Sequence, residues 1–174
     1  MRQLSVAILA TCINTSVIAG EYIDYEGVSL TVFGLSHHRT ENKKHSYHEV
    51  NPGLGLKKHL GSCFWNTANC YVGASYITKN SVGGNAYFLS AGSTWPLFTT
   101  FRGTRFNVGF SAQYVRYENP VKQEVYRGIA PIFSVGIGQG PWDLNVAILS
   151  KRPLQALTGK DAKAVYLLYL DYKF

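Results

Sequence analysis

Two short polar stretches carry side chains that could take part in proton transfer. The first is "GLSHHRT", with His37 and His38 side by side, and the second is "TKNS", with Lys79, Asn80 and Ser81. A neutral imidazole can accept a proton, and a serine hydroxyl can hydrogen-bond a reacting carbonyl or act as a nucleophile. A histidine in a polar loop is usually a solvated side chain, so these residue types alone leave catalysis open.

Cys63 and Cys70 flank a short polar turn in "GSCFWNTANCYV". In an oxidising compartment this spacing predicts a disulfide across the turn. A metal pair is the competing interpretation, but no His or second Cys pair lies nearby in sequence to complete a tetrahedral site. We therefore expect neither a metal nor a cofactor.

The elements that must position these residues are strands. Residues 104–117, 128–138, 142–149 and 164–174 alternate apolar and polar side chains, and weaker versions of the pattern occupy residues 27–38, 51–60, 69–79 and 85–95. Successive side chains of a strand point to opposite faces, so a period of two is typical of strands. With 14% aromatic residues and 17 glycines, the chain is predicted to be all-β.

The N-terminal residues 1–19 look like a signal peptide, with Arg2 before an apolar stretch and Val17-Ile18-Ala19 at its end. A lipoprotein site at Cys12 is an alternative, although threonine precedes that cysteine. Residues 20–174 are then a single exported domain. The net charge of +7 can reflect nucleic acid or an anionic membrane surface, and export argues against nucleic acid.

The alternating strands predict an eight-stranded antiparallel transmembrane β-barrel in the cell outer membrane. The longer connectors follow the first, third, fifth and seventh strands, as in outer-membrane barrels. A bilayer admits strands only when no sheet edge is left unpaired. A soluble barrel of the lipocalin type explains the alternation equally well. It does not explain outward Tyr and Trp at strand ends, nor the final Phe174, whose face is expected to meet lipid.

The predicted interior contains small or apolar residues, which suggest either a pocket or a tightly curved barrel. They are Gly53, Gly55, Gly73, Phe88, Ser90, Gly92, Gly109, Ile132, Gly136, Ala147 and Leu149.

The order and spacing of several stretches resemble the PagP-like lipid A palmitoyltransferases over roughly residues 28–174. These stretches are "YHEVNPGLGL", "ASYITKNSVGGNAYFLSAGSTW", "NVGFSAQY", "APIFSVGIGQGPWDL" and "AVYLLYLDYKF". The resemblance implies an eight-stranded barrel that moves a palmitoyl chain from a phospholipid to lipid A. The family has an amphipathic helix before the first strand, and residues 20–26 are too short for one.

The resemblance also implies site residues. The catalytic histidine corresponds to His37 or His38, and we favour His38, on the face shared with Gly34 and Ser36. Ser81 is expected on the inward face of the third strand. Asn80 stands where the family has aspartate, and an amide orients an imidazole only by hydrogen bonding.

Two prolines are expected to weaken strand contacts through which lipid enters sideways. Pro52 in the second strand and Pro131 in the sixth cannot donate to a β-ladder. Each could instead merely start or kink its strand. Ser90 is expected near the floor of an acyl pocket.

The expected partners are membrane phospholipid and lipopolysaccharide, with the protein acting as a monomer. Basic loop residues would bind lipopolysaccharide phosphates, or would only keep the loops soluble; they are Arg39, Lys43, Lys44, Lys79, Lys122, Lys151 and Arg152. Two functions follow. One is acyl transfer with His38 as the base, and the other is a non-catalytic barrel that binds lipid or protects the cell surface.

Overall fold

The computed structural model describes residues 22–40, 48–150 and 162–174. The predicted signal peptide and Lys43, Lys44, Lys151 and Arg152 lie outside these residues. The eight strands are β1 (Val28–Thr40), β2 (Val50–Cys63), β3 (Ala68–Ile77), β4 (Ala86–Thr99), β5 (Arg105–Asn119), β6 (Glu124–Gln139), β7 (Trp142–Ser150) and β8 (Ala162–Lys173). Among the described residues, no helix is long and apolar enough to cross a membrane.

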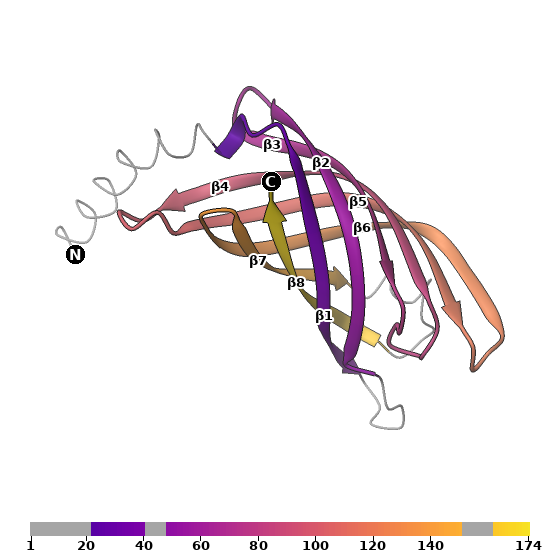
Figure 1. Ribbon diagram of the computed structural model, residues 1–174. Helices are drawn as coiled ribbons and strands as arrows, with labels where there is room; N and C mark the ends of the chain where they lie inside the picture. Colours follow the sequence, from indigo (N-terminus) through magenta and orange to yellow (C-terminus); the bar gives the residue numbers. More distant parts are fainter. Residues whose placement is uncertain (1–21, 41–47, 151–161) are drawn as a thin grey trace.

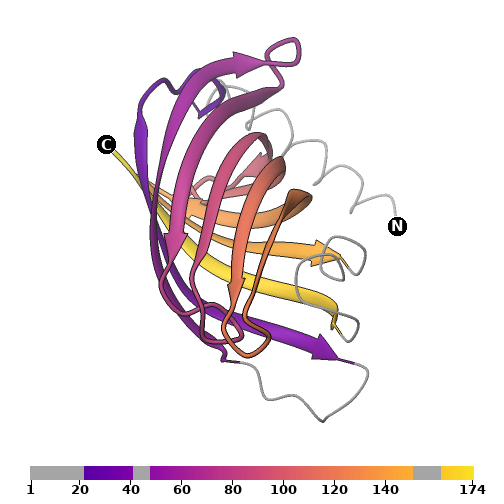
Figure 2. The same ribbon diagram turned by 90° about the vertical axis from the view of Figure 1, so that its right-hand side faces the viewer.

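The strands form one closed antiparallel barrel in chain order, and β1 pairs with β8 to close it (Figures 1 and 2). The closing ladder runs from Ser29↔Lys173 to Thr40↔Ala162. This confirms the predicted fold class and strand number. Several strands extend beyond their predicted ranges: β2 continues to Cys63, β6 begins at Glu124, and β4 continues through Pro96 to Thr99 with a register shift after Pro96.

The two faces of the strands differ as the alternation predicts. On β5, Asn107, Ser111 and Val115 are buried inside, whereas Phe110 and Tyr114 are exposed. Large apolar side chains such as Leu54, Leu89, Ile129 and Phe133 also face outward. A water-soluble barrel would bury such side chains, so this exterior is that of a transmembrane barrel, which carries an outward apolar band.

The two ends of the barrel are distinct. The inner end holds the turns at residues 64–67, 100–104 and 140–141, together with the start of β1 and Phe174. The outer end holds the longer connections after β1, β3 and β7, together with the connection after β5, which is only residues 120–123 and is shorter than predicted because β5 and β6 extend to Asn119 and Glu124. Trp65, Trp95 and Trp142 all lie at or near the inner end, and the Trp142 and Tyr172 rings lie 4.5 Å apart between centroids. These aromatic residues fit an interfacial girdle.

The segment before β1 is held against the inner end. Residues 22–24 form a single helical turn, and the Tyr25 hydroxyl donates to the Phe174 carbonyl at 2.9 Å. The Asn69 amide donates to the carbonyls of Ile23 and Tyr25 at 2.8 and 2.7 Å. Burial raises the pKa of the Tyr25 hydroxyl, so Tyr25 remains a neutral donor at physiological pH.

The predicted disulfide is present. Cys63 and Cys70 are bonded, with their Cα atoms 5.9 Å apart. It joins the inner ends of β2 and β3 across the turn at residues 64–67.

The apolar exterior predicts a position-dependent cost for charge. Leu89→Arg places a cation on an outward position that is 59% exposed and should lower the free energy of unfolding in phospholipid vesicles by about 2 kcal/mol or more. Val121→Arg is the control, since Val121 is 82% exposed in the β5–β6 loop, and it should be near neutral. Urea titration in vesicles measures both variants, and equal costs would contradict a lipid-facing wall.

Candidate functional site

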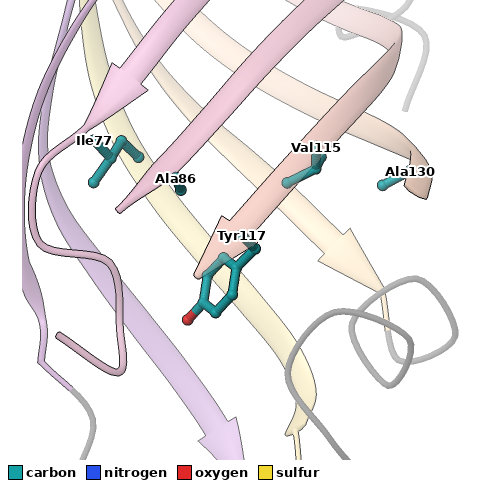
Figure 3. Packing of buried hydrophobic residues seen from close by; sticks show 5 residues of the cluster. All are labelled: Ile77, Ala86, Val115, Tyr117 and Ala130. Carbon is teal, nitrogen blue, oxygen red and sulfur yellow. The ribbon is translucent and has the colours of Figure 1, made fainter. Parts of the chain in front are cut away.

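A cavity of about 100 Å³ occupies the outer half of the barrel. Its walls are mainly apolar, and they include Phe33, Ile77, Phe88, Ile132, Leu149, Val165 and Leu167. Figure 3 shows the packed cluster on β3 to β6 that supports one side of it, with Tyr117 among Ile77, Ala86, Val115 and Ala130. Of the two interpretations of the interior, the pocket is therefore present.

The cavity ends at a charged floor. The Lys57 ammonium lies 2.6 Å from the Asp171 carboxylate and 4.6 Å from the centroid of the Tyr169 ring. Thr31 and Asn145 also donate to Asp171. Because a buried charge is costly unless it is paired and hydrogen-bonded, this arrangement holds Lys57 in place.

Below the floor, a second ionic cluster fills the inner half. Asp143 contacts both Arg105, at 3.1 Å, and Lys173. The Tyr22 ring lies 3.8 Å from the Lys173 ammonium. Any side chain at Gly136 or Gly138 would collide with Asn145 or Asp143, so these glycines make room for polar groups rather than for a ligand. A ligand must therefore approach the cavity from the outer end or through the wall.

His38 lines the cavity and His37 does not. The His38 Nε2 atom lies 3.3 Å from the Ser36 hydroxyl, whereas His37 is exposed and pairs with Glu49 at 3.1 Å. The expected sharing of a face with Ser36 is thus observed. Gly34 does not share this face with Ser36 and His38, because the register shifts between Phe33 and Leu35 in the pairing of β1 with both β2 and β8.

This β-bulge at Gly34 decides which side chains enter the cavity. Phe33 lines the interior before the bulge and Ser36 and His38 line it afterwards, while Leu35 is exposed. A bulge inserts one extra residue and re-aims the side chains that follow it. Without it, strict alternation from Phe33 would carry His37 inward and His38 outward.

Ser36 and Asn51 form a buried hydrogen-bond relay with His38. The Asn51 amide nitrogen donates to the Lys79 carbonyl at 2.7 Å, so its oxygen is the atom that accepts from Ser36. Because the Ser36 hydroxyl has one proton, it must accept from His38, and Nε2 carries the hydrogen. The proton-accepting atom of a neutral His38 is therefore Nδ1. Sequence reasoning missed Asn51, whose only signal was its inward phase next to Pro52.

Asn80 and Ser81 also line the cavity, but from a loop. Strand β3 ends at Ile77, so the expectation that Ser81 lies on the third strand was wrong. Both residues are nonetheless buried, because the β3–β4 loop folds inward over the cavity.

The Asn80 amide holds that loop together. Its nitrogen donates to the carbonyls of Asn85 and Glu118 at 3.0 and 2.8 Å, and its oxygen accepts from the amides of Val82 and Gly84 at 3.1 and 3.0 Å. These bonds use both donors and both acceptor positions of the side chain. Asn80 therefore ties the β3–β4 loop to the end of β5.

The two prolines differ in their surroundings. The β6–β7 ladder runs from Gln139↔Trp142 only as far as Phe133↔Ile148. Residues 124–132 of β6, including Pro131, have no register partner on the described part of β7, and the β5–β6 hairpin extends beyond β7 (Figure 1). Pro52 lies near the start of β2, where its carbonyl accepts from Thr78 at 2.9 Å and the β1–β2 register shifts.

Ser90 lines the cavity at the level of its floor. It pairs with Gly73, which in turn pairs with Lys57. Its contact with an acyl chain stays a prediction. Among the basic loop residues, Lys79 and Lys122 are exposed at the outer end.

No protein-family model matches the sequence, and neither does any curated protein. Among solved structures, the N-terminal β-barrel domain of Pseudomonas aeruginosa OprF aligns with 87% of this chain and 99% of its own, at 12% identity and a TM-score of 0.46. Ail, the attachment invasion locus protein of Yersinia pestis, aligns with 86% of this chain and 100% of its own, at 14% identity and a TM-score of 0.41. Because both TM-scores are below 0.5, we assign the fold from the strand pairing of this chain and not from these alignments.

The role of Asn80 can be tested by making it an acid. Asn80→Asp removes both donors to Asn85 and Glu118, so the free energy of unfolding should fall by about 2 kcal/mol. Asn85→Asp is a matched control, because the Asn85 side chain accepts from Tyr76 and a carboxylate still can. Denaturant titration should separate the two variants, and an Asn80→Asp protein as stable as the parent would show that the amide is not structural.

Proposed function

We propose that this protein is an outer-membrane barrel that binds one acyl chain of a membrane lipid in the cavity of its outer half. The observation that supports this most directly is that the apolar cavity lies against a section of β6, residues 124–132, that has no register partner on the described part of β7. Ile132 on β6 and Leu149 on β7 both line the cavity, and the ladder between their strands stops one residue short of them.

The unpaired section offers an acyl chain a sideways route. Pro131 has no amide hydrogen, so β6 cannot donate to β7 at that position. Outside the barrel at this level, Ile129 and Phe133 are exposed, so the surface leading to the opening is also apolar. A chain that passes between β6 and β7 exchanges one apolar environment for another.

The cavity volume limits what can enter without rearrangement. A cavity of about 100 Å³ is smaller than an apolar cavity of roughly 150 Å³ that binds benzene. It therefore accepts the end of a chain as it stands. A longer chain requires β6 and β7 to separate further, and the unpaired section allows that movement without breaking ladder hydrogen bonds.

Acyl transfer to lipid A is the second candidate, and the position of His38 favours it. His38 and Ser81 line the same cavity. In this hypothesis the His38 imidazole takes the proton of a lipid A hydroxyl while the hydroxyl oxygen attacks the phospholipid ester, and it then gives that proton to the departing lysophospholipid oxygen. Ser81 would donate to the oxyanion, while Lys79 and Lys122 would meet lipid phosphates. The PagP-like resemblance supports this candidate, and the structural role of Asn80 weighs against it.

Binding is tested by filling the cavity. Ala147→Phe places a ring inside the cavity, and native mass spectrometry of protein extracted from outer membranes should then show the loss of one bound phospholipid per barrel. Ala91→Phe makes the same change on an exposed outward position of β4 and should retain the lipid. Equal retention by both variants would exclude the cavity as the binding site.

Transfer is tested in a strain that lacks its own lipid A palmitoyltransferase. If the protein is an enzyme, mass spectra of lipid A should show species with one added acyl chain, and His38→Gln should abolish them while His37→Gln should not. A folded barrel, identified by its heat-dependent gel mobility, that adds no chain would leave lipid binding as the function.

A further inference from the structure

The turn at residues 64–67, at the inner end, has an unusual backbone. Phe64, Trp65 and Asn66 have φ values of 49°, 56° and 61°, so three consecutive residues with side chains are left-handed. In the rest of the described chain, Gln123 is the other non-glycine residue with a positive φ. This region is disfavoured for L-residues, and a bulky aromatic residue there is an outlier.

Several bonds around the turn hold this conformation. The Cys63–Cys70 disulfide crosses its base, and Cys63 pairs with Ala68. Within the turn, the Thr67 hydroxyl donates to the Phe64 carbonyl at 2.7 Å. Strained backbone persists only where its surroundings determine it, and such outliers point to function.

The conformation projects an indole away from the barrel. Trp65 is 95% exposed, although tryptophan is among the residues that gain most from leaving water. Phe64 is directed back to the wall, where its ring stacks on Trp95 of β4 at 5.7 Å between centroids. The disulfide and the stacking of Phe64 on Trp95 therefore hold the backbone of Trp65 against the barrel, while the Trp65 side chain stays exposed.

The surroundings of Trp65 indicate a lipid partner rather than a protein. Near the turn, Leu60 on β2 and Leu97 on β4 are exposed, and Phe64 stacks on Trp95, so the outward apolar band of the barrel continues to this end. The β4–β5 turn at the same end carries Phe101, which is 94% exposed, and Arg102, whose guanidinium lies 5.5 Å from the Phe101 ring. Exposed aromatic rings beside a cation suit the interface of a bilayer with anionic phospholipids.

We propose that the turn Phe64–Thr67 is a disulfide-clamped anchor that inserts Trp65 into the phospholipid headgroup region of the inner leaflet. Phe101 and Arg102 provide a second contact with the same leaflet. The anchor depends on the membrane embedding of the barrel but not on the interior cavity or its chemistry. It fixes the depth of the inner end through a covalently closed turn.

Tryptophan fluorescence tests the anchor in the full-length barrel. A protein with Trp95→Phe and Trp142→Phe retains Trp65 alone, and is refolded into phosphatidylcholine and phosphatidylglycerol vesicles whose acyl chains carry bromine near the headgroup. Lipid bromine should quench Trp65, and aqueous iodide should not. Reducing the disulfide, or replacing both cysteines by serine, should remove most of the lipid quenching.

The control protein retains Trp142 alone, through Trp65→Phe and Trp95→Phe. Trp142 lies on the wall at the start of β7, so lipid should quench it whether or not the disulfide is present. If iodide quenches Trp65 while lipid quenches only Trp142, the barrel is embedded in the bilayer but Trp65 is not an anchor. If lipid quenches neither tryptophan, the barrel is not embedded in the bilayer, and the anchor is excluded as well. Lipid quenching of Trp65 that survives reduction would overturn the clamp.

Discussion

Backbone amides and carbonyls have no hydrogen-bond partner in hydrocarbon, so a sheet that crosses a bilayer must close on itself. In this protein the ladder between β1 and β8 makes that closure, and the alternation of side chains then decides what meets lipid and what is enclosed. The enclosed residues include five ionisable side chains: Lys57, Arg105, Asp143, Asp171 and Lys173. They are tolerated because each contacts a partner of opposite charge.

The interior is divided by these ion pairs. In the inner half, Asn145 and Asp143 occupy the space that Gly136 and Gly138 leave, and the Tyr22 ring lies against the Lys173 ammonium. In the outer half the lining is mainly apolar and a cavity remains. The same half contains the section of β6 that has no register partner on the described part of β7. The filled half therefore stabilises the barrel, and the open half is where lipid binding and any chemistry of His38 are proposed.

Much of the fold could be predicted from the sequence, because a period of two is a local signal that each strand shows independently. The faces of β5 to β8 were predicted in this way, whereas the disulfide was predicted from the spacing of Cys63 and Cys70, and His38 was favoured through the family resemblance. Local alternation does not report where register shifts, so the bulge at Gly34 could not be predicted, nor could the continuation of β4 through Pro96. The alternation of the third strand predicted that Ser81 would point inward from that strand. The strand instead ends at Ile77, because the Asn80 amide organises a loop there. The Ser36–Asn51 relay and the β6–β7 opening depend on pairing between distant strands, which no single segment encodes.

We propose that an acyl chain enters the outer half of the barrel between β6 and β7. The most direct test uses a phospholipid with a photoreactive diazirine near the end of one acyl chain, loaded into vesicles that contain the folded protein. After irradiation, mass spectrometry of the protein locates the adducts. If the chain enters between β6 and β7, we expect adducts on inward residues such as Ile132, Leu149 and Val165. Adducts confined to outward residues such as Ile129 and Phe133 would contradict it.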